Sequence, residues 1–579
     1  MLFSGRRRAR ISGIVLWAWL APAWAVVLDV QIQGVEGDVE SNVRATLSIL
    51  QEDAARMSEA RLRRLHLQAE GEIEQALRPF GLYRPTIQST LTAESNAWVA
   101  RYTIDPGQPV RVAERDVQLA GEGQNDPDLR AIVAGFPLKP GDVADHRRYE
   151  DGKTRLRRRA LSTGYLDAAF DPAELRVDPA AGTAVVRLTL HTGPRYTFGP
   201  VRLQQDILNP EFLARFVPFE TGDYYNVRQL LDLQYALDDT EYFSRVEVVP
   251  HPEQAVDGAV PIEVELDPNN RHKYTFGLGY GTDTGPRGTL GWDNRRVNSL
   301  GHRWRSQIKL AQVDASAQFS YLIPIDNPAT DSLDLNGGLR ETRVENRTSR
   351  ITSVGIARND RDPPWQRSLR LNLEHERFEL ANGSGDDQIL SFLPGATWTY
   401  TRADDRLYPR DGLRWSLDLL SSISADTSPF AQALSDTRWV HPAGSRGRWI
   451  LRQQTGATLA SALADLPLSK RFFAGGDNSV RGYAFQELGP RNAEGQVQGG
   501  RYLVTASGEF EQMLWQQWGA AVFIDTGNAF DDGNMDLKTA AGLGLRWRSP
   551  VGLLKLDVAQ PIDDPGADWR LHLSLGSEL

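Results

Sequence analysis

The sequence lacks cysteine and long apolar runs, and these two absences exclude several classes of protein. With no cysteine among its 579 residues, the chain cannot form disulfides or bind a metal through thiolates. Beyond the N-terminal segment, no apolar run reaches the ~20 residues that a membrane-spanning helix requires. The formal net charge of -10 is acidic, which is unsuited to nucleic acid. We therefore expect no nucleic-acid partner.

The N-terminus has the three parts of a secretory signal peptide. A basic segment with Arg6, Arg7, Arg8 and Arg10 precedes the short apolar run 11–20. Ala23-Trp24-Ala25 then forms a small-x-small cleavage site, so we predict a signal peptide over residues 1–25. The alternative is a membrane anchor, but the apolar run is shorter than a spanning helix needs.

The C-terminal part of the chain alternates between apolar and polar residues, which is the period of a β-strand. The pattern covers 501–511, 542–548 and 569–576, with arginine on the polar face of several strands. Such a face indicates a wet lumen, with the apolar face towards lipid. Eleven of the fifteen tryptophans lie between residues 271 and 579, as expected of interfacial belts. We predict an all-β membrane barrel of about sixteen strands over 269–579.

The part before the barrel is an α+β repeat. In the first unit, apolar residues at helical spacing predict one amphipathic helix over 62–80, and strand-like runs at 27–32, 83–90 and 98–104 surround it. The segment 107–112 recurs as 193–198, and Pro140-Gly141-Asp142 recurs as Thr221-Gly222-Asp223. A period of roughly eighty residues predicts three units of strand, helices, strand and strand. We place them at 26–106, 107–192 and 193–268.

Three motifs resemble those of outer-membrane assembly factors, in which periplasmic POTRA domains precede a sixteen-stranded barrel. The first is Val480-Arg481-Gly482-Tyr483, on a long segment over about 461–500. The second is Phe523-Ile524-Asp525-Thr526-Gly527, and the third is the pair of strands over 545–557. The resemblance covers nearly the whole mature chain. It implies that the first motif lies on a loop folded into the lumen, and that Phe523, Asp525 and Gly527 lie on the lumen wall.

The number of repeats points to one branch of this family. Three POTRA domains resemble the TamA branch, the outer-membrane subunits of the translocation and assembly module, as does the segment 292–298. This resemblance implies a TamB-like partner anchored in the inner membrane, and unfolded outer-membrane clients such as autotransporters. It implies a location in the outer membrane of a Gram-negative bacterium, with the POTRA domains in the periplasm. Most such barrels end in an aromatic residue, whereas this chain ends in Leu579.

The chemistry of the loop motif predicts a specific contact. Gly482 permits a backbone turn that other residues resist, and Val480 and Tyr483 can anchor the tip of the loop. Arg481 offers a planar fork of donors that suits a carboxylate. Because Asp525 and Phe523 share one face of their strand, Asp525 can face the lumen. We therefore predict that Arg481 meets Asp525 inside the barrel.

The first and last strands form the predicted lateral seam. Glycine weakens a strand, and the first strand has glycines at alternate positions. We therefore expect few paired residues across the seam and edges that can receive a client strand. The seam residues are Tyr274, Phe276, Gly277 and Gly279 in the first strand and Leu573, Leu575 and Gly576 in the last.

An aspartic protease is the enzymatic alternative to an assembly factor. Asp-Thr-Gly occurs at 283–285 and at 525–527, and aspartic proteases pair two such carboxylates. The first copy has the features of a hairpin turn, and Asn528 follows the second where those proteases prefer a smaller residue, so we expect no enzymatic activity. No metal cluster, phosphate loop or nucleophile elbow occurs, so we expect no cofactor. A secretion pore with two POTRA domains and a general BamA-like insertase with five remain as alternatives.

Overall fold

The computed structural model describes ten stretches of the chain. They are residues 28–53, 57–94, 97–283, 285–344, 347–379, 386–405, 407–424, 426–549, 552–564 and 566–575. The predicted signal peptide, Gly576 and Leu579 lie outside the described residues.

The first α/β unit packs one long helix against a three-stranded sheet. Its strands are β1 (Leu28–Gln33), β2 (Thr86–Ala93) and β3 (Trp98–Asp105), in the order β1-β3-β2. Its helices are α1 (Gly37–Thr46), α2 (Ser48–Gln51) and α3 (Glu59–Leu77), followed by the 3-10 turn η2 (Arg78–Phe80). The apolar face of α3 packs on Ala100, Tyr102 and Ile104 of β3. This face consists of the predicted residues Leu62, Leu65, Ala69, Ile73, Ala76 and Leu77, all buried.

The second and third units repeat this order. The second contains β4 (Arg111–Ala120), η3 (Glu122–Asn125), α4 (Pro127–Ala134), α5 (His146–Ser162), β5 (Ala169–Asp178) and β6 (Thr183–His191). The third contains β7 (Thr197–Gln204), α6 (Pro210–Ala214), α7 (Val227–Asp238), β8 (Phe243–Pro250), η4 (Pro252–Gln254) and β9 (Ala259–Pro268). The sheet orders are β4-β6-β5 and β7-β9-β8. The predicted order of strand, helices, strand and strand is confirmed in all three.

The sequence repeat corresponds to a repeated backbone turn. Gly141 and Gly222 have φ angles of +93° and +99°, a conformation that favours glycine. The amide of Gly141 donates to the Val112 carbonyl, and the amide of Gly222 donates in the same way to Phe198. The turn therefore returns the chain to the first strand of its unit in both copies, which accounts for the recurrence of Gly-Asp.

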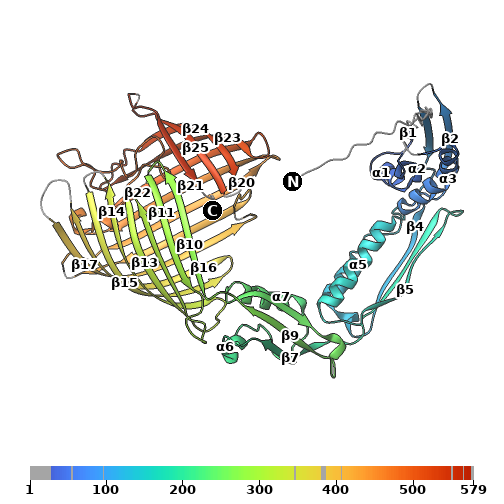
Figure 1. Ribbon diagram of the computed structural model, residues 1–579, viewed down its shortest axis with the longest axis horizontal. Helices are drawn as coiled ribbons and strands as arrows, with labels where there is room; N and C mark the ends of the chain where they lie inside the picture. The colour runs from blue at the N-terminus through green and yellow to red at the C-terminus, as the bar shows by residue number, and fades with distance from the viewer. Residues whose placement is uncertain are drawn as a thin grey trace, which may run out of the picture. The chain divides into compact units, whose positions relative to one another are not determined.

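The barrel is a single antiparallel sheet in which each strand pairs with the next (Figure 1). Its order runs from β10 to β26, and β18 and β19 are two parts of one strand interrupted at Ser422, which gives the predicted sixteen. The first eight strands are β10 (His272–Gly281), β11 (Gly285–Asn294), β12 (Arg303–Ala311), β13 (Asp314–Pro324), β14 (Asp331–Val344), β15 (Arg347–Asp362), β16 (Trp365–Glu379) and β17 (Asp386–Ala403). The others are β18 (Gly412–Ser421) with β19 (Ile423–Ser424), β20 (Ala431–Ala443), β21 (Gly447–Leu459), β22 (Tyr502–Met513), β23 (Trp518–Phe530), β24 (Lys538–Ser549), β25 (Gly552–Pro561) and β26 (Arg570–Leu575).

The two faces of the barrel wall follow the alternation of the sequence. In β24, Leu543 and Leu545 are exposed on the outer face, whereas the next residue, Arg546, is fully buried on the inner face. In β23, Val522 and Ile524 are exposed while Phe523 and Asp525 are buried. The outer face therefore offers apolar side chains to lipid. Among the described residues, no helix is long and apolar enough to cross a membrane.

The first unit allows a test of the assigned core face of α3. Leu65 is 1% exposed and Leu67 is 80% exposed on the same helix. Leu65→Ala should destabilise this unit by about 2–5 kcal/mol, because it removes buried methyl groups and leaves a cavity. Leu67→Ala is the matched control and should change stability by less than about 0.5 kcal/mol. Hydrogen exchange of residues 59–77 in the full-length protein measures both, and equal effects would contradict the assignment.

Candidate functional site at the lumen loop

The long loop between β21 and β22 is packed on the inner face of the barrel. It spans residues 460–501 and contains the short turns η5 (Leu463–Asp465) and η6 (Leu468–Lys470). Two backbone bridges, Phe472 with Gly500 and Ala474 with Leu488, fold it back on itself. Val480 and Tyr483 belong to an apolar cluster that includes the wall residues Leu503, Ala529 and Ala540. The tip of the loop is therefore held by apolar packing on both sides of Arg481.

Arg481 meets Asp525, as predicted. Its Nε lies 2.7 Å from Asp525 Oδ2 and its Nη2 lies 3.0 Å from Oδ1, which makes the pair bidentate. The backbone N–H of Arg481 also donates to Asp525 Oδ2, at 3.0 Å. Arg481 is 2% exposed and Asp525 is fully buried. A bidentate pair in such surroundings is strong because little water competes with it.

Arg481 also binds carboxylates on two further strands. Its Nη1 lies 2.8 Å from Glu509 Oε2 on β22 and 2.9 Å from Asp557 Oδ2 on β25. The guanidinium carbon lies 3.3 Å from the centroid of the Phe523 ring, a cation–π contact. One side chain of the loop thus joins β22, β23 and β25.

A second layer of charges balances these carboxylates. Arg546 donates to Glu509 Oε1 at 2.6 Å and also to Asp557. Arg448 lies 3.0 Å from Glu511, whose other oxygen accepts from the Tyr408 hydroxyl. Since the Ser507 hydroxyl donates to Asp525 Oδ1 at 2.6 Å, each carboxylate that binds Arg481 has a second donor, which a buried charge requires.

This cluster limits the expected wet lumen to other parts of the wall, where inward-facing residues such as Arg305 and Arg340 are exposed. Glu509, Glu511 and Arg546 are at most 2% exposed, although they lie on the polar face of the wall. The loop covers them, so the polar face is dry at this level of the barrel. A buried ion pair that loses one partner leaves an uncompensated charge, so the dry surroundings raise the free-energy cost of removing Arg481.

Gly482 occupies a position that other residues would strain. Its φ angle is +97°, and a Cβ added there would lie 3.0 Å from the Ala540 Cβ and 3.3 Å from Pro561. Both the backbone turn and the close approach to β24 and β25 therefore favour glycine. Gly527, in the second motif, lies on β23 opposite Thr505 of β22.

The edge strands of the barrel are β10 and β26. Tyr274 and Phe276 are 63% and 79% exposed on the outer face of β10, and Gly277 and Gly279 lie on its other face. In β26, Leu573 is half-buried and Leu575 is exposed. The two strands approach each other, but no β-ladder joins their described residues. We call this boundary the lateral seam; Gly576, also assigned to it, lies outside the described residues.

The two Asp-Thr-Gly copies have separate partners. Asp525 binds Arg481, whereas Asp283 accepts a hydrogen bond from the backbone of Asp477. Neither contact resembles the paired carboxylates of an aspartic protease, which share a proton.

Sequence reasoning missed three residues of the Arg481 site: Glu509, Arg546 and Asp557. The alternation of apolar and polar residues along each strand placed Glu509 and Arg546 on the polar face. Which polar residues of neighbouring strands meet depends on the register of the strands, and the two-residue period of the sequence does not determine that register.

Comparison with known proteins identifies the family of the barrel and the type of the first α/β unit. The model of the Omp85 superfamily domain matches residues 265–578, and that of POTRA domain TamA domain 1 matches residues 29–106. Outer membrane protein assembly factor BamA of Nitratidesulfovibrio vulgaris is 24% identical over 375 residues. The match covers 61% of this chain and 46% of that protein, so the chain spans about half the length of this relative.

Among solved structures, BamA from Haemophilus ducreyi lacking POTRA domains 1-3 has a TM-score of 0.66 at 17% identity. This match covers 80% of the present chain and 99% of that one, and it shows a shared fold. CdiB from Acinetobacter baumannii has a TM-score of 0.47 at 14% identity, covering 93% of this chain and 99% of that one.

The fold is that of an outer-membrane barrel preceded by POTRA-like α/β domains. Because the family model covers more than half of the chain, the protein belongs to the Omp85 superfamily. Within it, the first α/β unit matches the TamA type of POTRA domain. This family points to the outer membrane of a Gram-negative bacterium.

Arg481→Ala should loosen the lumen loop while the barrel stays folded. Removing the guanidinium leaves buried Asp525 without its cation and leaves Glu509 and Asp557 with their ion pairs to Arg546, which costs about 3–5 kcal/mol. Asp525→Ala should be milder, because Glu509 and Asp557 still hold Arg481. The double variant should be no worse than Arg481→Ala alone, since the two residues act as one unit.

Hydrogen exchange of residues 471–489 measures this loosening. Arg491→Ala is the matched control, because Arg491 is exposed on the same loop and donates only to carbonyls of that loop. Simple addition of the Arg481 and Asp525 effects in the double variant would contradict the coupling.

Proposed function

We propose that this protein is a TamA-type assembly factor that helps to translocate and insert autotransporters and other β-barrel proteins. It acts without covalent chemistry, ATP or a cofactor, by offering strand edges to unfolded clients. The match of residues 29–106 to a TamA-type POTRA domain supports this branch of the family over the general BamA-like insertase.

The observation that carries the proposal is the lateral seam, where no ladder joins the described residues of β10 and β26. Each described barrel strand pairs with its neighbour along a ladder, except where β10 faces β26. An unpaired edge presents backbone N–H and C=O groups that an added strand can satisfy. The exposed Tyr274, Phe276 and Leu278 on the outer face of β10 would let such a strand enter from lipid.

The proposed POTRA domains extend over 26–106, 107–192 and 193–268, and they lie in the periplasm. Each three-stranded sheet has two edges, such as β1 and β2 in the first. These edges can receive a strand from an unfolded client or from a TamB-like partner anchored in the inner membrane. The lipid bilayer is the third partner, along the apolar outer face of the barrel.

The packed loop disfavours the alternative of a passive secretion pore. The loop buries Arg481, Glu509 and Arg546 against the wall, so it covers that sector of the lumen and narrows the passage there. In planar bilayers, the intact protein should show small, brief conductances. Replacing 461–500 by a short linker should give larger and steadier channels. Large steady channels from the intact protein would favour the pore.

Locking the seam should stop client assembly. The Leu573 amide lies 3.2 Å from Thr282 Oγ1, so these two positions are neighbours across the seam and are chosen for a cysteine pair. In cells that depend on this protein, we expect oxidation of Thr282→Cys/Leu573→Cys to reduce autotransporter assembly at least about tenfold, and reduction to restore it.

The matched control is Leu556→Cys/Leu573→Cys, which joins β25 to β26 within the barrel wall. Leu556 and Leu573 are direct partners in that ladder, so the second pair carries the same Leu573 change without crossing the seam. Normal assembly with the seam oxidised would rule out lateral opening.

A further inference from the structure

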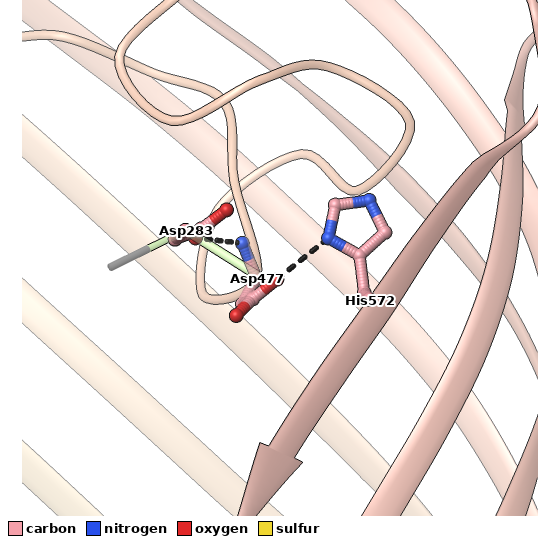
Figure 2. Close-up of side chains that lie close together, drawn as sticks. All are labelled: Asp283, Asp477 and His572. Carbon is pink, nitrogen blue, oxygen red and sulfur yellow. Dashed lines mark hydrogen bonds and ion pairs between the residues drawn. The ribbon is translucent and has the colours of Figure 1, made fainter. Parts of the chain in front are cut away.

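Three segments far apart in the sequence meet at the lateral seam. They are the turn between β10 and β11, the lumen loop just before Arg481, and the last strand β26. In Figure 2, Asp477 of the loop lies between Asp283 of the turn and His572 of β26, and dashed lines join it to both. The loop therefore touches both edges of the barrel at one place.

Asp477 makes most of these contacts. Its Oδ1 lies 2.6 Å from His572 Nδ1 and accepts from the Thr282 hydroxyl at 3.0 Å. Its backbone N–H donates to Asp283 Oδ2 at 2.6 Å. The Leu573 amide in turn donates to Thr282 Oγ1, the one direct hydrogen bond from β26 to this turn among the described residues.

The contacts of His572 fix its tautomer. The Gly482 N–H donates to His572 Nε2 at 3.0 Å, so this nitrogen carries no proton. The proton of the neutral ring is then on Nδ1, where it is donated to Asp477. Both ring nitrogens of His572, a buried side chain, are thus committed to the lumen loop.

The same cluster has the composition of a metal site, but its hydrogen bonds oppose one. Asp283, Asp477 and His572 each offer one ligand atom, and these atoms lie within 4.8 Å of one another. A metal on Nδ1 would move the ring proton to Nε2, where the Gly482 N–H already points. Metal binding would therefore break the contact between β26 and the tip of the loop.

We propose that Asp477 and His572 are positioning residues that clasp both edges of the seam to the lumen loop, so that the seam opens only when this clasp lets go. The seam clasp consists of Thr282, Asp283, Asp477, His572 and Leu573. This inference rests on the proposed function, in which the opened seam receives a client strand.

The clasp is separate from the Arg481 anchor. Arg481 binds carboxylates on β22, β23 and β25, whereas the clasp binds β26 and the turn after β10. The clasp can release the two edges while Arg481 still holds the loop in the barrel. His572 is also the ladder partner of Asp557, so anchor and clasp lie on adjacent strands.

Hydrogen exchange of the purified full-length protein in lipid nanodiscs tests the clasp without any client. In Asp477→Ala, the amides of β26 and of the β10–β11 turn should exchange about tenfold faster or more, since two hydrogen bonds across the seam are lost. Exchange in β14 to β16 should not change. Asp477→Asn keeps an oxygen acceptor for Thr282 and His572, and it should restore slow exchange.

Glu494→Ala is the matched control, an exposed acidic residue on the same loop. His572→Phe keeps an aromatic ring but loses the hydrogen bonds to Asp477 and Gly482. This variant replaces Asp477→Ala in the experiment if Asp477→Ala lowers the yield of folded barrel. Unchanged seam exchange in His572→Phe or in folded Asp477→Ala would overturn the clasp. This exchange experiment contains no client, so it tests the clasp alone. The proposed function fails in a different experiment, if cells with an oxidised seam still assemble autotransporters normally.

Discussion

The buried guanidinium of Arg481 is the interaction on which the arrangement of the lumen depends. Its positive charge lies among the carboxylates of Asp525, Glu509 and Asp557, which come from three different strands. Without it, those carboxylates would have too few cations, and burying them would be unfavourable. The loop therefore supplies the charge that these carboxylates need and also covers this part of the wall. The polar wall is dry there only because the loop is present.

This constraint divides the barrel into a fixed part and a changeable part. The wall from β22 to β25 is joined by ladders and by Arg481, whereas β10 and β26 have no ladder between their described residues. The edges are held instead by a few side-chain hydrogen bonds through Asp477. Side-chain contacts of this kind are weaker in total than a ladder of backbone bonds, so the proposed opening would cost least free energy at the seam.

Much of the fold followed from periodicity, whereas contacts between distant segments did not. The helical spacing of Leu62 to Leu77 identified the core face of α3, and the alternation in β23 placed Asp525 inward. Arg481 and Asp525 could be paired because each has the chemistry the other needs. Glu509 and Asp557 could not be added, because strand register is absent from the pattern. Asp477 and His572 lie on a loop and on a distant strand, with no local signal linking them. The expected wet lumen holds for inward-facing residues such as Arg305 and Arg340, which are exposed, but not for those that the loop covers, because composition does not show where a loop packs.

The central claim is that clients enter through the seam, and photo-crosslinking in living cells tests it most directly. A photoreactive amino acid at Phe276, which is 79% exposed on β10, should crosslink to an autotransporter during its assembly. The same amino acid at Leu371, which is 47% exposed on β16, should not, because β16 is paired on both sides. Equal crosslinking at the two positions, or none at Phe276, would contradict entry at the seam.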